Sequence, residues 1–419
     1  MKQKLDEILK KQLELVNPSE EDATKIEQLS ENFTKELTNS LKKKKIKAEV
    51  FIGGSLAKNT LVRKDVYDID VFVRFDKSYD DKKISSLLGK VLPKAKKVHG
   101  SRDYYQKHVD SIIIEIIPVL KISKPEQAVN VTDLSYFHVN YLVNQINKNK
   151  NLVNEIRLAK TFAHAQNVYG AESYIHGFSG YALELLITHY RTFLKFIQEI
   201  EKLDITKGKL VIDQAKQYKD KLAVLKELNK SKTNGPIVLI DPTYKERNAL
   251  SSLSKETLYK FQNVCRSFLK NSSSDFFIKK SVSDEFKKQK PIIIKVKTNK
   301  QAGDIAGTKS KKFYDFFNSR LKKEFTIKKS GFEYEESKNL ANFYLVLSKK
   351  PDNIIQGPPV TALNNLTNFK KAHPKAFVKK GFAHTKLTHN LTFSSWFKLF
   401  LKKDKKIIRD MGIIGIKQS

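Results

Sequence analysis

The 419-residue chain has one cysteine, one tryptophan, two methionines and no long apolar run. The lone Cys265 excludes an intramolecular disulfide and any zinc site built from several cysteines. No apolar stretch approaches the ~18 residues of a membrane-spanning helix, and Met1-Lys2-Gln3-Lys4 leads into a charged, amphipathic pattern instead of a signal peptide. We therefore expect a cytoplasmic protein with no membrane partner.

Glycine, proline and acidic residues are also scarce. The 16 Gly and 11 Pro argue against extensive disorder, and 40% hydrophobic residues can form buried cores. A chain of this length exceeds the size of one hydrophobic core, so several domains are expected. Lys and Arg exceed Asp and Glu by 79 − 45 = 34, which attracts polyanions. A lysine-rich soluble protein has the same excess, so composition alone leaves a nucleic-acid partner open.

The first part of the chain has the pattern of an α/β layer. Apolar positions at helical spacing run from about Leu5 to Leu41 and break at Asn17-Pro18-Ser19, which predicts two helices. Runs of β-branched and aromatic residues at 46–52, 67–75 and 111–120 predict strands. This order predicts a catalytic sheet covered by helices.

The rest of the chain predicts a helical domain and then a small α+β unit with a basic end. Helical spacing extends from Asn151 to about Leu203, and Asn271 to Asp275 is typical of a loop. Later segments predict a strand, a helix and a strand, at 292–297, 311–325 and 342–347. From Asn353 to the end, 13 Lys or Arg stand against 2 Asp, a net charge of 13 − 2 = +11.

These patterns predict an α+β, multidomain protein. Its expected parts are a catalytic head with a sheet at 1–145 and a helical neck at 146–280. A small α+β body at 281–350 and a basic C-terminal tail at 351–419 are expected to follow. The tail is the strongest candidate for an RNA-binding surface, because its lysines recur around Phe369 and Phe377. The candidate RNA-binding lysines are Lys370, Lys371, Lys375, Lys379 and Lys380.

Two acidic residues alternate on the second predicted strand. Asp68 and Asp70 lie at i and i+2, so both carboxylates face the same side of the strand, with Ile69, Val71 and Val73 on the other side. Two adjacent carboxylates repel each other unless a positive charge lies between them, and a divalent cation suits such oxygen ligands. The alternative is a solvated acidic edge.

Glu115 stands alone among five isoleucines in Ile112 to Ile117. An unpaired charge in a buried strand is costly, which implies a metal ion or a basic partner. The alternative is a solvent-facing residue on an edge strand.

The segment Gly53-Gly54-Ser55 to Thr60 comes just before the acidic strand. It predicts a glycine turn with Ser55 as a helix N-cap, and with backbone N–H groups, a hydroxyl and the Lys58 ammonium available to a triphosphate. An ordinary turn is the alternative. With Asp68, Asp70 and Glu115, this turn gives the arrangement needed to hold two metal ions ~3.5–4 Å apart, which predicts nucleotidyl transfer.

These motifs resemble the DNA polymerase β nucleotidyltransferase superfamily, with its Gly-Ser, alternating carboxylate pair and third carboxylate. The following segments are similar to the central domain of archaeal, class I CCA-adding enzymes. They are Glu155-Ile156-Arg157-Leu158-Ala159-Lys160, Tyr169-Gly170-Ala171-Glu172, Gly177-Phe178-Ser179-Gly180-Tyr181 with Glu184-Leu185-Leu186, Asp241-Pro242 and Arg247-Asn248.

The resemblance implies that Asp68, Asp70 and Glu115 are catalytic and bind two Mg²⁺ ions. It implies nucleotide contacts from the glycine turn and from further side chains, namely Gly54, Ser55, Lys58, His138, Lys160, Tyr169 and Arg247. Each of these side chains has a structural alternative, as a packing, capping or solvated residue.

This chain departs from the family pattern at several positions. Glu115 replaces Asp, and Lys58 replaces an Arg that could make a two-pronged phosphate contact. Leu134 and Tyr136 replace Arg and Pro, and His176 replaces Arg. These departures affect the expected nucleotide selection more than the expected catalysis.

The resemblance implies addition of CMP and AMP from CTP and ATP to the 3′ end of tRNA without a template. It also implies binding of the tRNA acceptor arm, and a homodimer. The alternatives are an enzyme restricted to A, such as a poly(A) polymerase or an oligoadenylate-synthesising relative, and an inactive RNA-binding relative.

Overall fold

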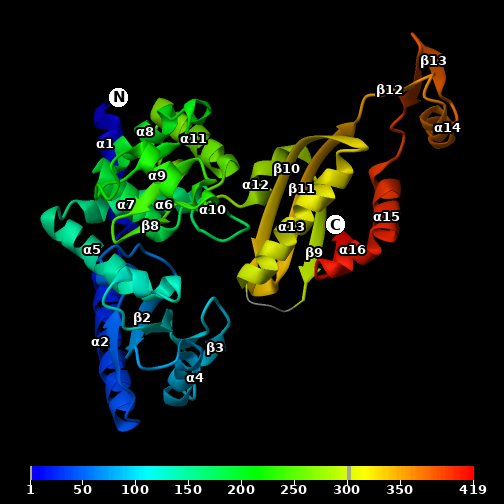
Figure 1. Ribbon diagram of the computed structural model, residues 1–419. Helices are drawn as coiled ribbons and strands as arrows, with labels where there is room; N and C mark the ends of the chain where they lie inside the picture. The colour runs from blue at the N-terminus through cyan, green and yellow to red at the C-terminus, as the bar shows by residue number, and fades with distance from the viewer. Residues whose placement is uncertain (1, 300–302) are drawn as a thin grey trace. The chain divides into compact units, whose positions relative to one another are not determined.

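The computed structural model describes residues 2–299 and 303–419 (Figure 1). The chain divides into two compact units, Met1–Lys280 and Ser281–Ser419. Each unit contains both helices and sheets, so the predicted α+β, multidomain fold is confirmed. None of the helices in the described part of the chain is long and apolar enough to cross a membrane.

A five-stranded sheet forms the first half of the first unit, in the order β1-β2-β5-β4-β3. The strand bounds are Ala48–Ile52 for β1, Tyr67–Phe75 for β2, Lys96–Val98 for β3, Tyr104–Val109 for β4 and Ile112–Leu120 for β5. β2 and β5 are parallel neighbours, and the other pairs are antiparallel. The three strands predicted in this part are confirmed, and the hairpin of β3 and β4 adds two more.

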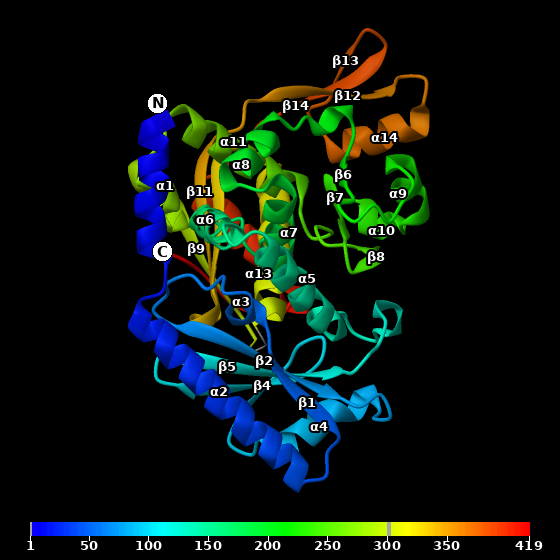
Figure 2. The same cartoon turned by 90° about the vertical axis from the view of Figure 1, so that its left-hand side faces the viewer.

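Helices α2 (Glu20–Lys43) and α4 (Asp81–Val91) cover one face of this sheet, as Figure 2 shows for α2. Ser19 is the N-cap of α2 and accepts a hydrogen bond from the backbone N–H of Asp22, so the predicted break before this helix is confirmed. The sheet contributes Ile69, Val71 and Val73 to the shared core. This leaves the opposite face of β2 and β5 for the acidic side chains.

The second half of the first unit is mainly helical, as predicted. Its helices are α5 (Ser135–Lys148), α6 (Leu152–Ala165), α7 (Gly180–Tyr190), α8 (Phe193–Lys202), α9 (Lys221–Glu227), α10 (Lys230–Thr233) and α11 (Lys255–Lys270). A small sheet in the order β6-β7-β8 joins them, with bounds Leu210–Ile212, Ile237–Asp241 and Tyr244–Asn248.

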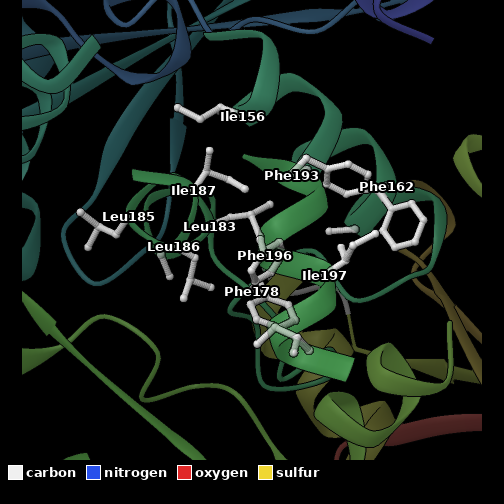
Figure 3. Close-up of a cluster of buried hydrophobic side chains, with 14 of the residues drawn as sticks. Ile156, Phe162, Phe178, Leu183, Leu185, Leu186, Ile187, Phe193, Phe196 and Ile197 are labelled. Carbon is white, nitrogen blue, oxygen red and sulfur yellow. The ribbon is translucent and has the colours of Figure 1, made fainter. Parts of the chain in front are cut away.

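One aromatic-rich core holds these helices together (Figure 3). Phe162 of α6 lies against Phe193 and Phe268, with ring centroids 5.2 and 5.3 Å apart. The apolar side of α1 (Lys2–Val16), with Leu5, Leu9 and Leu13, packs against this core and not against the five-stranded sheet. The first helix therefore belongs to the helical part, although the sequence assigned it to the head.

The second unit is built on an antiparallel sheet in the order β10-β11-β9-β15. The bounds are Ile292–Thr298 for β9, Phe325–Glu335 for β10, Leu340–Lys349 for β11 and Ile413–Gln418 for β15. α12 (Val282–Phe286) precedes the sheet, and α13 (Gly303–Leu321) packs on it through Phe313 and Phe317. The helix predicted at 311–325 thus begins earlier than predicted, at Gly303. It also ends earlier, at Leu321, because Phe325 starts a strand.

The predicted tail at 351–419 is not one separate piece. Residues 353–387 form a three-stranded sheet in the order β12-β14-β13, with bounds Asn353–Pro359, Phe382–Leu387 and Phe377–Lys379, and the helix α14 (Leu363–Ala372). The chain then returns to the body. α15 (Phe393–Lys403) and α16 (Lys405–Asp410) add Trp396, Phe400 and Ile408 to the body core, and β15 pairs with β9. The predicted boundary at 350/351 is wrong for these last residues because they complete the body sheet.

Candidate active site

The three predicted catalytic carboxylates lie on two central, parallel strands. Asp70 of β2 is directly opposite Glu115 of β5, and Asp68 lies two residues earlier on β2. Neighbouring residues in register on parallel strands point to the same face, so all three side chains share the face away from α2 and α4. The alternative of an edge strand for Glu115 is wrong, because β5 lies between β2 and β4.

The charges of these carboxylates act on one another. Burial raises the pKa of Asp70 to about 6, and the negative charges of Glu115 and Asp68 act in the same direction. Asp68 Oδ2 accepts a hydrogen bond from Lys64 Nζ at 2.9 Å, and Glu115 Oε1 accepts one from Gln106 Nε2 at 2.8 Å.

The described residues contain no ready-made group of three His, Cys, Asp or Glu that could hold a metal ion. The oxygen ligands and the raised pKa of Asp70 nevertheless fit a divalent cation, because such an ion would offset the crowded negative charge. Asp68 and Glu115 each use one carboxylate oxygen for these hydrogen bonds, so the other oxygen can serve the ion.

The glycine turn lies directly against Asp70. Gly54 begins the short helix α3 (Gly54–Ala57) with a φ of 57°, and a Cβ on it would lie 1.7 Å from Asp70 Oδ2. The backbone N–H of Gly53 donates to the carbonyl oxygen of Asp70 at 2.8 Å. Only glycine at position 54 permits this approach. Ser55 lies inside α3 and Gly53 precedes it as the N-cap, so the predicted capping role of Ser55 is wrong.

Two predicted nucleotide-binding lysines meet at one buried carboxylate. Glu184 of α7 is 1% exposed; its Oε2 lies 2.6 Å from Lys58 Nζ and its Oε1 lies 2.7 Å from Lys160 Nζ. Thr60 Oγ1 accepts from Lys160 Nζ at 3.0 Å and donates to Glu184 Oε1 at 3.3 Å. Burial alone would raise the pKa of Glu184, but Lys160 and Lys58 together lower it to about 2. We call Lys58, Thr60, Lys160 and Glu184 the Glu184 cluster.

Two more predicted nucleotide-binding residues meet at Asp241, at the end of β7. Arg247 Nη1 lies 2.7 Å and His138 Nε2 lies 2.9 Å from Asp241 Oδ2. The Tyr181 hydroxyl donates to Asp241 Oδ1 at 3.0 Å, and its ring stacks on His138 at 4.0 Å between centroids. Burial lowers the pKa of His138, although Asp241 acts in the opposite direction. We call His138, Tyr181, Asp241 and Arg247 the Asp241 cluster.

Tyr169 lies within electrostatic reach of both Glu184 and Asp70. A Cβ on Gly180, the first residue of α7, would lie 2.7 Å from the Tyr169 hydroxyl oxygen, so the ring lies against the start of the helix that carries Glu184. Burial and the negative charges of Glu184 and Asp70 raise the pKa of the Tyr169 phenol. Lys58 in turn lowers the pKa of Asp70 and that of His138. The carboxylates and both clusters therefore lie within electrostatic reach of one another.

Three departures from the family pattern have structural partners. Leu134 is buried in the core of the five-stranded sheet. The Tyr136 ring lies 3.8 Å from the Arg74 guanidinium carbon, as a cation–π contact. His176 has a φ of 51°, and its carbonyl oxygen accepts from the backbone N–H of Ser254 at 3.0 Å.

The predicted RNA-binding lysines lie in the second unit, on the small sheet and its helix. Lys370 and Lys371 end α14, Lys375 follows it, Lys379 ends β13, and Lys380 has a φ of 49° in the next turn. All five are exposed, and none makes an ion pair with any described residue. We call these five residues the exposed lysine group.

Sequence reasoning missed the two residues that organise the site, Glu184 and Asp241. Both lie in segments that resemble the family, Glu184-Leu185-Leu186 and Asp241-Pro242, but neither was predicted to have a role. Their signal is a single acid among apolar neighbours, the same signal that identified Glu115. The Lys58 and Lys160 partners of Glu184 lie 126 and 24 positions away in the chain, which the sequence alone cannot indicate.

Paired carboxylates on a central sheet, with a glycine turn and lysines beside them, define a nucleotidyltransferase. The family model described as a nucleotidyltransferase domain matches residues 34–133, and the one described as the second domain of tRNA nucleotidyltransferase matches residues 154–278. Enzymes of this class use divalent metal ions.

The chain belongs to the family of CCA-adding enzymes. It is 35% identical to the CCA-adding enzyme of Nanoarchaeum equitans over 355 residues, which cover 83% of this chain and 85% of that protein. It is 31% identical to the CCA-adding enzyme of Methanocaldococcus jannaschii over 405 residues, which cover 91% and 87%. Among solved structures, Cid1 poly(U) polymerase has a similar fold, with a TM-score of 0.52 at 13% identity, covering 65% of this chain and 98% of that one. The predicted family and enzyme class are confirmed.

Proposed function

We propose that this protein adds CMP and AMP from CTP and ATP to the 3′ end of tRNA, and so builds or repairs the CCA terminus. The observation that carries this proposal is the pairing of Asp70 with Glu115 across parallel strands, with Asp68 on the same face, in a chain of the CCA-adding family. The terminal 3′ oxygen of the tRNA attacks the α-phosphate of the nucleotide. A phosphodiester bond forms, and pyrophosphate leaves.

Asp68, Asp70 and Glu115 would hold two Mg²⁺ ions. When bound, these ions lower the pKa of the attacking hydroxyl and offset the charge that develops on the phosphates. The chain itself would supply the ligands from two paired central strands. Gly54 lets the backbone of the turn come close to Asp70, so the phosphates can lie beside the carboxylates.

The nucleotide would lie between the carboxylates and the two clusters. Lys58 and Lys160 suit the triphosphate because their ammonium groups donate to phosphate oxygens, and Ser55 adds a hydroxyl on the adjoining turn. His138, Tyr169 and Arg247 suit the ribose and base, through ring faces and N–H or O–H donors. These residues would contribute by binding and alignment, since the reaction needs no covalent enzyme intermediate.

The exposed lysine group would bind tRNA phosphates. Five exposed ammonium groups on one small sheet and its helix give the positive surface that a polyanion needs, with Phe377 and Val378, 40% and 55% exposed, beside them. We further propose that the enzyme acts as a homodimer in the cytoplasm, which light scattering of the purified protein and cell fractionation would test.

The test uses purified protein, Mg²⁺ and a tRNA transcript that lacks its CCA end. CTP alone should add C residues, and CTP with ATP should give a tRNA ending in CCA. A chelator in excess over Mg²⁺ should abolish both reactions. ATP alone giving runs of A would contradict the proposal in favour of an A-only transferase, and no incorporation under any condition would indicate an inactive RNA-binding relative.

A further inference from the structure

Glu184 is a buried charge that the proposed reaction leaves without a role. It lies in the first turns of α7, in the helical part of the chain, and it accepts hydrogen bonds from Lys58 and Thr60 of the segment that follows the glycine turn. It also accepts one from Lys160 of α6. One carboxylate therefore joins two helices to the segment that continues the turn against Asp70.

We propose that Glu184 is a positioning residue that holds Lys58 and Lys160 side by side to receive the triphosphate of either nucleotide. This inference rests on the proposed function and goes beyond it, because it assigns nucleotide affinity to a residue that would not touch the nucleotide. The two lysines use different oxygens of the same carboxylate, so Glu184 fixes the spacing of the two ammonium groups.

The charge balance of the cluster favours binding of an anion. Two ammonium groups share one carboxylate, which leaves a net charge of +1 among side chains that are at most 10% exposed. Burial lowers the pKa of Lys160, and Glu184 opposes that change. Without Glu184, the two cations would repel each other and neither would have a charged partner.

The hydrogen-bond capacity of the two lysines also favours binding of an anion. Each ammonium group has three N–H donors. Lys58 has one bond here, to Glu184, and Lys160 has two, to Glu184 and Thr60, so each lysine keeps at least one donor for a phosphate oxygen. Glu184 can thus hold both lysines while they bind the nucleotide.

Glu155 provides a matched control within the same core. It is another acid on the helices of this part, but its Oε2 accepts from the backbone N–H of Phe193 and its Oε1 from Asn151. No lysine among the described residues forms an ion pair with it. Burial raises the pKa of Glu155, whereas the two lysines lower that of Glu184. Loss of the Glu155 charge changes the packing of helices without changing the lysines.

The first experiment compares Glu184→Gln with Glu155→Gln in steady-state kinetics. Loss of one charge-assisted bond to each lysine should raise the KM for CTP and the KM for ATP by about tenfold or more, with a similar increase in the Ki of inorganic pyrophosphate. The KM for tRNA should not change. Glu155→Gln should change thermal stability alone. A nucleotide KM and a pyrophosphate Ki at wild-type values in Glu184→Gln would overturn the proposal.

The second experiment is a double-mutant cycle with Lys58→Met. If Glu184 acts through Lys58, the effects of Glu184→Gln and Lys58→Met on nucleotide KM should overlap, so the double variant should bind nucleotide better than the product of the single effects predicts. Additive effects would contradict action through Lys58.

These experiments also separate this inference from the proposed function. If Glu184→Gln does not fold, the double variant replaces it, because that variant removes one positive and one negative charge together. A wild-type KM for nucleotide in a folded double variant would overturn the inference. Wild-type protein that adds no nucleotide to tRNA would instead contradict the proposed function.

Discussion

The charged side chains of the active site have partners among the described residues, whereas those of the exposed lysine group do not. In the active site, the buried charges of the two clusters are held by partners on other elements, as Glu184 is by Lys58 and Lys160. The five lysines of the exposed lysine group stand in solvent and pair with no acid of the described chain. Fixed charges act through geometry and low local dielectric, whereas exposed charges act through their number and are screened by salt. Single substitutions should therefore have large effects in the first region and small, additive effects in the second.

The largest effect is expected from Asp70→Ala, which removes the carboxylate opposite Glu115. Incorporation should fall by at least ~10²-fold, since the lost group serves the charge of the transition state. Asp68→Ala should behave in the same way. Asp110→Ala, in the turn after β4 and paired with exposed Lys25, is the control and should keep full activity. Activity of Asp70→Ala above ~1% of wild type would contradict a metal-binding role.

Glu115→Gln tests whether Glu115 has a catalytic or a structural role. Turnover should fall by about 10²-fold. Unfolding of the metal-free protein should need at least as much denaturant as wild type, because the Glu115 charge raises the pKa of Asp70 and so opposes ionisation at this site. Gln106 can still donate to the remaining side-chain oxygen. Denaturant unfolding with a chelator present, together with a turnover assay, checks both parts. Normal turnover would exclude Glu115 as a ligand.

Asp241→Asn tests whether a fixed charge also stabilises the fold. The variant leaves Arg247 without its buried carboxylate partner, so the free energy of unfolding at pH 7 should fall by about 3 kcal/mol. Burial would raise the pKa of Asp241, but His138 and Arg247 hold it below its usual 3.8. A lowered pKa contributes stability that is complete above about pH 4 and is lost as the pH falls below it.

Urea unfolding at pH 7, 5 and 3 measures this dependence. The difference between wild type and Asp241→Asn should be smaller at pH 3 than at pH 5. Asp220→Asn, which changes an exposed helix cap at α9, should be nearly neutral at all three pH values. A difference that is no smaller at pH 3 than at pH 5 would mean that packing, and not charge, explains the loss.

The smallest effect is expected from the exposed lysine group. Lys379→Ala with Lys380→Ala should raise the KM for tRNA and flatten its salt dependence by up to ~2 units, because each phosphate contact releases counterions. The kcat at saturating tRNA should be nearly unchanged. Lys42→Ala with Lys43→Ala, at the exposed end of α2, removes the same charge elsewhere and serves as the control. Equal salt slopes in both double variants would show that the lysines act only as a solubilising surface.

Local patterns predicted much of the fold. The β-rich runs at 67–75 and 111–120 predicted β2 and β5, the alternation around Asp68 and Asp70 predicted the buried face of β2, and Ser19 marked the start of α2. These features depend on neighbours within a few residues. The helix predicted at 311–325 included Phe325, but the helix ends at Leu321. Phe325 starts β10, and local pattern missed this strand because pairing with the distant β11 fixes it.

The sequence predicted many residues of the candidate site, but it did not predict the contacts that arrange them. Asp68, Asp70 and Glu115 were found from their positions on strands, but their alignment needs the register of β2 and β5. Lys58 and Lys160 were expected to bind nucleotide, whereas Glu184, which joins them, was not expected. A buried polar contact between distant segments depends on tertiary packing, which no local pattern encodes.

The most direct test compares Asp70→Ala with the Lys379→Ala, Lys380→Ala double variant in two assays on the same preparations. Single-turnover incorporation at saturating tRNA measures the chemistry, and a filter-binding titration measures the Kd for tRNA. We expect Asp70→Ala to keep the wild-type Kd and lose the rate, and the double lysine variant to keep the rate and lose affinity. A weakened Kd in Asp70→Ala that accounts for its lost activity, or a reduced saturating rate in the lysine variant, would contradict the separation of chemistry from RNA affinity.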